Sequence, residues 1–400
     1  MRKYFLKKRT ETCIFKKNVV LLYPNWFVGS VEEQIHRIYF SLVRAALWGQ
    51  APEWPVEHTD TLLRLNAQQG TAALVLPGVL TQDAIPVEAK MQMKALCIST
   101  MQQQVRLQHT LSVAWRALAQ VGIRPVLMKG AGLAALYPEP QMRSWGDIDL
   151  FVGKNQYHPA CAVMRETFPK ALKFDEELDH YKHYNLIADG ISMEVHRITV
   201  DLQHPMDARH YAQMEAYGVA HACDREIDGV HVQIFEPTFN ALFVMLHAWE
   251  HAMTKGAGIR QICDLVLLLH HEAATIDRPR LQQWLSQLHL TDVWQLYITI
   301  AVQYLGLPQD EAPLYEKGES RELRAERFVG DMLEGRLTNE SKEESKPSKN
   351  RFVRKWHTMQ QRLRNARRIG QYSPAYGRHM QVETLLRGAL RLFAKDRHWE

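Results

Sequence analysis

The stretch that decides the fold is Gly146-Asp147-Ile148-Asp149-Leu150-Phe151-Val152, a short apolar run that begins with two carboxylates one residue apart. Successive side chains of a strand point to opposite faces, so Asp147 and Asp149 share one face of the expected strand. The alternate residues, Ile148 and Leu150, then point into a core. Carboxylate oxygens are the ligands that Mg²⁺ prefers, and proteins commonly hold this ion by one or two carboxylates together with substrate phosphates. The pair therefore predicts a magnesium site on a sheet surface.

A glycine turn lies seventeen residues upstream of Asp147. Residues 125–129 predict a short buried strand, and residues 130–137 predict a helix that Pro138 ends. Backbone N–H groups at a helix N-terminus stabilise phosphates. A metal ion beside a phosphate-binding turn is the resulting hypothesis.

The remaining pattern predicts an α+β protein, with a small mixed sheet embedded in a largely helical chain. Apolar positions recur at helical spacing through most of residues 31–120. Asp189-Gly190 stands between two alternating runs, residues 184–187 and 191–196, which is a strong hairpin signal. Beyond Pro205 the periodicity is helical again, so we expect helices over residues 205–315 and, after a charged linker, over residues 351–400.

The composition is that of an ordinary globular protein. The 400 residues are 46% hydrophobic and 23% charged, enough for a sizeable core. The five cysteines are scattered and none forms a Cys-x-x-Cys pair, so neither a disulfide framework nor a zinc knuckle is indicated. No secretory signal and no apolar run of membrane-spanning length is present. We therefore expect a cytoplasmic protein.

Both ends of the chain are basic, whereas its middle is acidic. Residues 351–368 carry seven Lys or Arg and an apolar stripe at helical spacing. Peripheral membrane docking and nucleic-acid binding both use such a helix. The interpretation that we favour is a terminal helix that packs its stripe on the acidic body. The stripe consists of Phe352, Trp356, Met359 and Leu363.

These motifs, with Leu136-Tyr137-Pro138 and Arg143 between them, resemble the uncharacterised nucleotidyltransferase branch of the DNA polymerase β-like superfamily. The resemblance implies a glycine turn after the first strand, two aspartates on the next strand and a third carboxylate on a later strand. Glu194, in Met193-Glu194-Val195-His196, matches the third position. The resemblance covers about residues 90–270 and continues into His247, His251, Arg260 and Asp264.

The resemblance implies transfer of a nucleoside monophosphate from an NTP, with release of pyrophosphate. Such transfer needs phosphate charge neutralised and the attacking oxygen aligned with the leaving group, which two metal ions about 4 Å apart accomplish. We expect Asp147 and Asp149 to bind the nucleotide-side Mg²⁺. Glu194 is expected to bind a second Mg²⁺ or to act as the base that activates the acceptor.

The nucleotide is expected to contact the glycine turn, at Lys129, Gly130 and Ala131. The wider superfamily has Gly or Ser where this chain has Ala131, so no hydroxyl is available there and Lys129 is the expected phosphate contact. Arg143 is expected to contact the triphosphate, although a surface role is the alternative. His196 shares the face of Glu194 and is either an orienting group or a structural histidine.

His247 and His251 lie four residues apart, which is metal-ligand spacing on a helix. A zinc protease would need His-Glu-x-x-His, but here Glu250 stands immediately before the second histidine. We expect both histidines to line the nucleotide cleft with Arg260 and Asp264. A polar network that ties helices together is the alternative.

The expected domain division follows from these motifs. It comprises a basic extension (residues 1–30), a helical region (31–121), a nucleotidyltransferase catalytic core (122–204), a helical domain closing the cleft (205–315), a charged linker (316–350) and basic helices (351–400).

Two other functions fit the same residues. One is a non-catalytic accessory or binding protein that keeps the fold, in a polysaccharide or peptide-modification pathway. The other is an RNA-modifying nucleotidyltransferase, which the basic ends favour and the acidic body disfavours. The sequence predicts neither the acceptor, the preferred NTP nor the oligomeric state.

Overall fold

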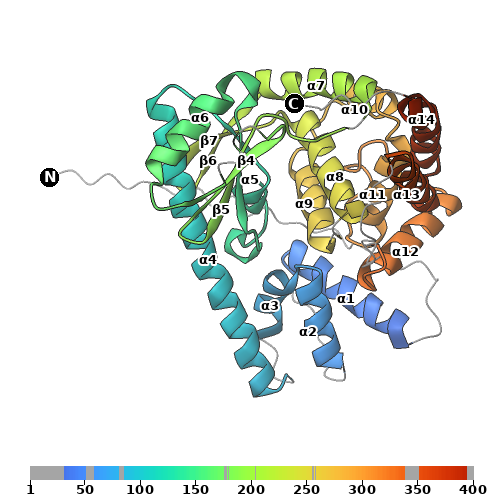
Figure 1. Ribbon diagram of the computed structural model, residues 1–400. Helices are drawn as coiled ribbons and strands as arrows, with labels where there is room; N and C mark the ends of the chain where they lie inside the picture. Colours follow the sequence, from blue (N-terminus) through green and yellow to red (C-terminus); the bar gives the residue numbers. More distant parts are fainter. Residues whose placement is uncertain are drawn as a thin grey trace.

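The computed structural model describes residues 31–50, 58–80, 85–174, 178, 180–202, 204–254, 256, 258–337 and 351–393. In these residues a seven-stranded sheet lies on one side of the molecule and a body of helices on the other (Figure 1). The expected basic extension over residues 1–30 lies outside the described residues.

The sheet has the strand order β3-β4-β5-β2-β1-β7-β6. Strands β2 and β5 pair in parallel, as do β1 and β7, whereas the other neighbours are antiparallel. This mixed sheet among helices confirms the predicted α+β class. The strands are β1 (Val126–Met128), β2 (Asp147–Phe151), β3 (Leu172–Lys173), β4 (His183–Ala188), β5 (Ile191–His196), β6 (Cys223–Ile227) and β7 (Val230–Ile234).

The helices account for most of the described chain. They are α1 (Val31–Leu47), α2 (Thr59–Gln68), α3 (Ala72–Leu80), α4 (Val87–Gln120), α5 (Gly130–Ala134), α6 (Gly153–Thr167), α7 (Pro205–Ala220), α8 (Pro237–Thr254), α9 (Ile259–His271), α10 (Arg278–Gln287), α11 (Thr291–Gln303), α12 (Glu319–Leu333), α13 (Arg351–Tyr372) and α14 (Pro374–Phe393), with a short 3-10 turn at Pro140–Met142.

The central strands pack one face on an apolar core and carry the carboxylates on the other. Ile148 and Leu150 of β2 are fully buried in a core that also contains Met193 and Val195 of β5. Helices α4 and α6 close this core with residues such as Trp115. Because strand side chains alternate, the carboxylates of β2 and β5 lie on the opposite face, which the helical body adjoins.

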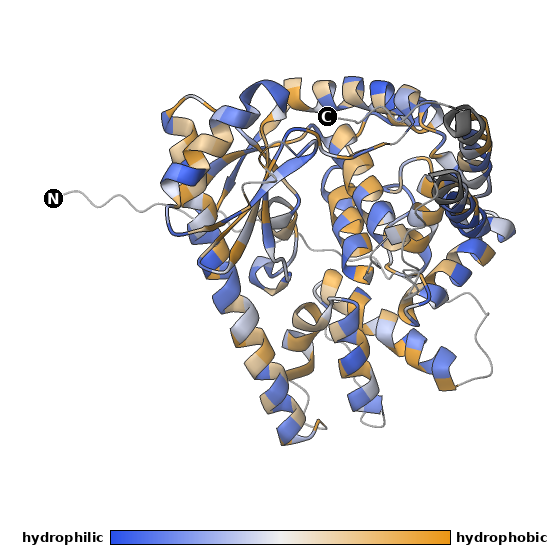
Figure 2. Cartoon of the chain, in the orientation of Figure 1, coloured by the Kyte–Doolittle hydropathy of each residue, from blue (hydrophilic) through white to orange (hydrophobic). Residues whose placement is uncertain are grey.

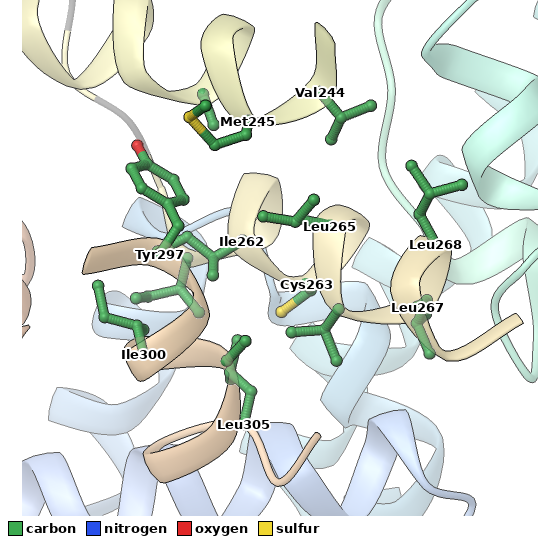
Figure 3. Close-up of a cluster of buried hydrophobic side chains, with 14 of the residues drawn as sticks. Val244, Met245, Ile262, Cys263, Leu265, Leu267, Leu268, Tyr297, Ile300 and Leu305 are labelled. Carbon is green, nitrogen blue, oxygen red and sulfur yellow. The ribbon is translucent and has the colours of Figure 1, made fainter. Parts of the chain in front are cut away.

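The helical body has a second core. Apolar sides of α8, α9 and α11 interlock there, as Figure 3 shows for Met245, Ile262 and Tyr297, all at most 1% exposed. Hydrophobic residues cover much of these helices in Figure 2, and α8 and α11 are buried on all sides over residues 237–246 and 293–301. Phe151 of β2 belongs to this core and contacts Phe235, with ring centroids 5.7 Å apart, so the sheet and the body are joined directly.

The expectation of helix alone after Pro205 was wrong. Strands β6 and β7 form a hairpin around Asp228-Gly229, and β7 joins the sheet beside β1, so the sheet continues beyond residue 204. Part of the expected charged linker is also structured, since α12 occupies Glu319–Leu333. Residues 338–350 lie outside the described residues. The domain division itself stays a prediction.

Within the expected C-terminal stripe, Trp356 is 48% exposed and Met359 and Leu363 are half-buried, while the Phe352 side chain lies outside the described residues. Further along α13, Ala366, Ile369 and Tyr372 are buried. The packing of the stripe on the acidic body stays a prediction. Among the described residues, no helix combines the length and apolar character needed to cross a membrane.

Candidate active site

Three carboxylates gather on the polar face where β2 and β5 run side by side. In the parallel register Asp149 lies opposite Glu194, and Asp147 is two residues from Asp149 on the same face. One ligand oxygen from each carboxylate lies within 4.8 Å of the other two. The structure therefore brings the three predicted metal ligands into one cluster.

Asp149 lies at the centre of this cluster and is 1% exposed. Its Oδ2 is 3.0 Å from Lys129 Nζ, and its Oδ1 is 3.0 Å from His196 Nε2. Burial would raise the pKa of the Asp149 carboxyl, but Lys129 and His196 hold that pKa well below its usual range. The neighbouring Asp149 charge, followed by burial, instead raises the pKa of Asp147. The two aspartates therefore differ in how firmly their charge is held.

His196 joins the two strands through a single nitrogen. Its Nε2 is 3.0 Å from both Asp149 Oδ1 and Glu194 Oε2, and its side chain is 4% exposed. Burial opposes protonation, but the hydrogen bonds to Asp149 and Glu194 raise the pKa of His196 above its usual value. The imidazole thus positions the two carboxylates relative to each other.

His183 was not among the predicted site residues. It lies opposite His196 in the β4–β5 register, and its Nδ1 is 3.8 Å from Glu194 Oε2. Burial lowers the pKa of His183 to about 4. The hairpin register could have located it, since the turn at Asp189-Gly190 fixes which residues of β4 face β5.

The glycine turn presents Lys129 to the carboxylates. Lys129 precedes α5 and has φ 50°, a region that residues with a side chain rarely adopt. Gly130 also has positive φ, and a Cβ there would lie 3.2 Å from the Trp145 ring. Burial lowers the pKa of Lys129, but Asp149 and Asp147 outweigh this and raise the pKa. The ammonium is therefore charged and points at the aspartates.

Arg143 and Asp264 pair with each other. Arg143 Nε and Nη2 donate to the two oxygens of Asp264 at 2.6 and 2.7 Å, and Nη1 donates to the Gly130 carbonyl at 3.2 Å. Tyr137 donates to the same carboxylate at 2.7 Å. Burial opposes the charge on Asp264, yet Arg143 holds the pKa of Asp264 below its usual range. This network fastens the glycine turn to α9.

The remaining predicted residues come from α8 and α9. Arg260 donates to the Ser144 carbonyl, in the loop that leads into Asp147. His247 and His251 have ring centroids 4.4 Å apart. Burial, followed by the nearby Lys129 charge, lowers the pKa of His247 well below its usual value, so this imidazole is neutral.

Residues 55–306 match the model of a family described as uncharacterised nucleotidyltransferases. The chain belongs to this family. The matched range contains the whole sheet and every predicted site residue, and the match confirms the resemblance inferred from the sequence. Helices α12–α14 lie beyond it.

A crystal structure of an antigenic nucleotidyltransferase-like protein from Paracoccidioides brasiliensis is also similar to the chain. It has 17% sequence identity and a TM-score of 0.31, and the similarity covers 50% of this chain and 92% of that one. No curated protein matches the chain.

The donor set of this family member fits a divalent cation. Three carboxylates with oxygens within 4.8 Å of one another are hard ligands in an arrangement that suits Mg²⁺. Asp149 Oδ1 and Oδ2, however, already contact His196 and Lys129. An ion bound to Asp149 would therefore share this carboxylate with two groups of the protein.

Proposed function

We propose that the chain is a Mg²⁺-dependent nucleotidyltransferase. It moves a nucleoside monophosphate from an NTP to a hydroxyl or phosphate acceptor and releases pyrophosphate. The observation that carries this proposal is the cluster of Asp147, Asp149 and Glu194 on one face of β2 and β5, in a family described by nucleotidyl transfer.

In this proposal Asp147 and Asp149 hold the nucleotide-side ion, and Glu194 holds a second ion or accepts the acceptor's proton. The ions supply neutralisation of phosphate charge. The acceptor oxygen forms a bond to the α-phosphorus while the bond from that phosphorus to the β-phosphate oxygen breaks. His196 lowers the pKa of Glu194 against the effect of burial, so this carboxylate is ionised at neutral pH and can take a proton.

We propose two roles for the residues around the triphosphate. Lys129 and Arg260 supply positive charge, because Lys129 contacts Asp149 and the Arg260 charge lowers the pKa of Asp147. Arg143 and Asp264 position the glycine turn, Gly130 and Ala131, through the contact of Arg143 with the Gly130 carbonyl. Direct contacts of the nucleotide with Ala131, Arg143, Asp264, His247 and His251 stay predictions.

Incubation of the protein with each of the four NTPs, labelled at the α-phosphate, with Mg²⁺ and a cell extract tests the proposal. We expect label from at least one NTP to enter a defined acceptor, and to remain unincorporated with the Asp147→Asn variant. Label recovered in RNA would select the RNA-modifying alternative. No Mg²⁺-dependent incorporation from any NTP would contradict the proposal.

The accessory-protein alternative has one observation in its favour. Lys129 and His196 already compensate the charge of Asp149, so this carboxylate does not need a metal ion to balance its charge.

Calorimetric titration with NTP in the presence and absence of Mg²⁺ separates the two functions. We expect Mg²⁺-dependent binding, whereas no binding at millimolar nucleotide would favour the accessory role.

We also propose a cytoplasmic location. The four cysteines within the described residues, Cys97, Cys161, Cys223 and Cys263, are free thiols. Fractionation of cells that produce the protein at native level tests this location. We expect the protein in the cytosolic fraction, and its recovery in another fraction would contradict the proposal.

A further inference from the structure

A second group of metal-binding side chains lies where α7 begins. His204 is the N-cap residue of α7, and Asp207 lies in the first turn of that helix. His379 and Glu383 of α14 contact these residues. None of these residues belongs to the carboxylate cluster on β2 and β5.

Asp207 lies between two imidazoles. Its Oδ1 is 2.9 Å from His204 Nδ1, and its Oδ2 is 3.0 Å from His379 Nε2. One ligand atom from each of these three residues lies within 4.8 Å of the other two. Asp207 is buried, and the side chains of His204 and His379 are 20% and 18% exposed. The cluster is therefore enclosed, yet reachable from solvent.

The contacts of His204 place conflicting demands on its Nδ1. The Asp207 backbone N–H donates to Nδ1 at 3.1 Å, which requires a lone pair on that nitrogen. The other ring nitrogen, Nε2, is 2.8 Å from Glu383 Oε1 and so carries the proton. Nδ1 also lies 2.9 Å from Asp207 Oδ1. Its single lone pair can accept from the Asp207 N–H or bind a cation held beside Oδ1, so a bound cation would replace the backbone hydrogen bond.

The chemistry of the donors selects the cation. Imidazole nitrogens suit Zn²⁺ better than Mg²⁺, which prefers oxygen ligands. Histidines that bind metals usually donate their second ring N–H to a carboxylate, and His204 has this arrangement with Glu383. Two histidines and one aspartate leave a fourth tetrahedral position for solvent.

We propose that His204, Asp207 and His379 bind a Zn²⁺ ion that fastens α14 to α7. Because α14 lies beyond the family match and α7 within it, the ion would tie the C-terminal helices to the nucleotidyltransferase portion. His289, in the α10–α11 connection, stacks on His379 with ring centroids 4.1 Å apart and would limit the movement of that ligand. The bound zinc would link α7 to α14 and is separate from the proposed magnesium site.

Zinc content and thermal unfolding of the full chain test this proposal. The protein is treated with a chelator, incubated with Zn²⁺ and desalted, after which bound zinc is measured by mass spectrometry. We expect the His379→Gln variant to bind one equivalent of zinc less than the unsubstituted chain. It should also lose the rise in Tm that Zn²⁺ produces. Glu383→Gln should keep all three ligands but bind Zn²⁺ about 10–100-fold more weakly.

Two controls separate this site from other histidines. His158→Gln removes an exposed imidazole of α6 and should change neither readout. His183→Gln disrupts the group of His183, Glu194 and His196, which could also bind a metal, and should leave the zinc of the proposed site in place. Co²⁺ in place of Zn²⁺ should give a tetrahedral absorption spectrum that His379→Gln abolishes.

The proposal is overturned if the unsubstituted chain retains no zinc. It is also overturned if both His379→Gln and Asp207→Asn retain as much zinc as the unsubstituted chain. Loss of zinc only in His183→Gln would place the ion on the sheet instead and would equally reject the site at α7.

Discussion

The charge of Asp149 requires compensation because three carboxylates lie so close together. Two unit charges 4 Å apart interact by about 4 kcal/mol at an effective dielectric constant of 20. Lys129 and His196, each 3.0 Å from an Asp149 oxygen, provide the opposite charge within the protein. A Mg²⁺ ion at the cluster would balance part of the Asp149 charge. Lys129 and the metal ion would therefore compensate the same negative charge.

Lys129→Met tests this relation. Removing one partner of a buried ion pair typically lowers the free energy of unfolding by 3–5 kcal/mol, and we expect about 3 kcal/mol because Lys129 is 15% exposed. Millimolar Mg²⁺ should raise the Tm of the variant more than that of the unsubstituted chain. Lys182→Met is the matched control, because the partner of Lys182, Glu250, is 39% exposed and 3.7 Å away. This variant should lower the free energy of unfolding by less than about 1 kcal/mol. Equal Mg²⁺ effects on both chains would argue against the relation.

Asp264 should make stability depend on pH in the acid range. Its pKa is lowered in the folded protein by Arg143, so its stabilising effect is complete above the unfolded pKa of about 3.9 and is lost as pH falls through the lower folded pKa. At pH 7, Asp264→Asn leaves the Arg143 charge buried without its partner and should cost about 3–5 kcal/mol. Denaturant unfolding should show this difference shrinking below pH 4. A difference that stays constant down to pH 3 would contradict this assignment.

At the scale of elements, the same local sequence signal marks both hairpins of the sheet, but only one of them was predicted. Asp189-Gly190 correctly predicted the β4–β5 hairpin, and Asp228-Gly229 carries the same signal between β6 and β7. The second hairpin was missed because its strands are short and largely polar. Helix α12 was missed for a related reason, since its apolar stripe lies within a charged segment.

Contacts between distant residues could not be predicted in the same way. Tyr137 and Arg143 reach Asp264 across more than a hundred residues, and no local pattern encodes that pairing. The sequence did predict that Asp147 and Asp149 share a strand face, because that depends only on alternation. The position of Lys129 against Asp149 depends instead on how β1 pairs with β2.

Gly258 marks the joint between α9 and the loop after α2. A Cβ at this position would lie 2.5 Å from the backbone oxygen of Gln69, which cannot move independently of its chain. We expect Gly258→Ala to lower the free energy of unfolding by about 1–3 kcal/mol, as overpacking does. Gly330→Ala is the control, because Gly330 is inside α12 and a Cβ there would meet only the Glu334 side chain, at an ordinary contact distance of 4.0 Å. Alanine there should stabilise the protein by about 0.5–1 kcal/mol. Denaturant titration measures both, and equal effects would contradict the predicted close approach.

At the scale of the whole molecule, the C-terminal helices complete the helical body. Arg368 of α13 donates to the carbonyls of Leu337 and Met253, the latter in the last turn of α8. Tyr372 donates to Asp331 of α12 at 2.7 Å. The segment beyond the family match is therefore attached to the helix that carries His247 and His251.

Arg368→Gln should loosen this attachment. Hydrogen bonds from a charged donor are typically worth 1.5–3 kcal/mol, and we expect a loss of about 1–2 kcal/mol because the guanidinium is partly exposed. Hydrogen exchange should then become faster in α13 and in the last turn of α8. The neighbouring Arg367 is exposed, so Arg367→Gln should leave exchange unchanged. Unaltered exchange in Arg368→Gln would show that other contacts hold α13.

Pyrophosphate release during label transfer from NTP is the most direct test of the central claim, which is that Asp147, Asp149 and Glu194 form a metal-dependent nucleotidyl-transfer site. With the acceptor identified, Asp147→Asn should reduce release more than about 100-fold, beyond the loss typical of residues outside the ligand set. Asp224→Asn, on the exposed strand β6, should retain full activity, and circular dichroism should show both variants folded. Equal pyrophosphate release by Asp147→Asn and the unsubstituted chain, with or without Mg²⁺, would contradict the claim.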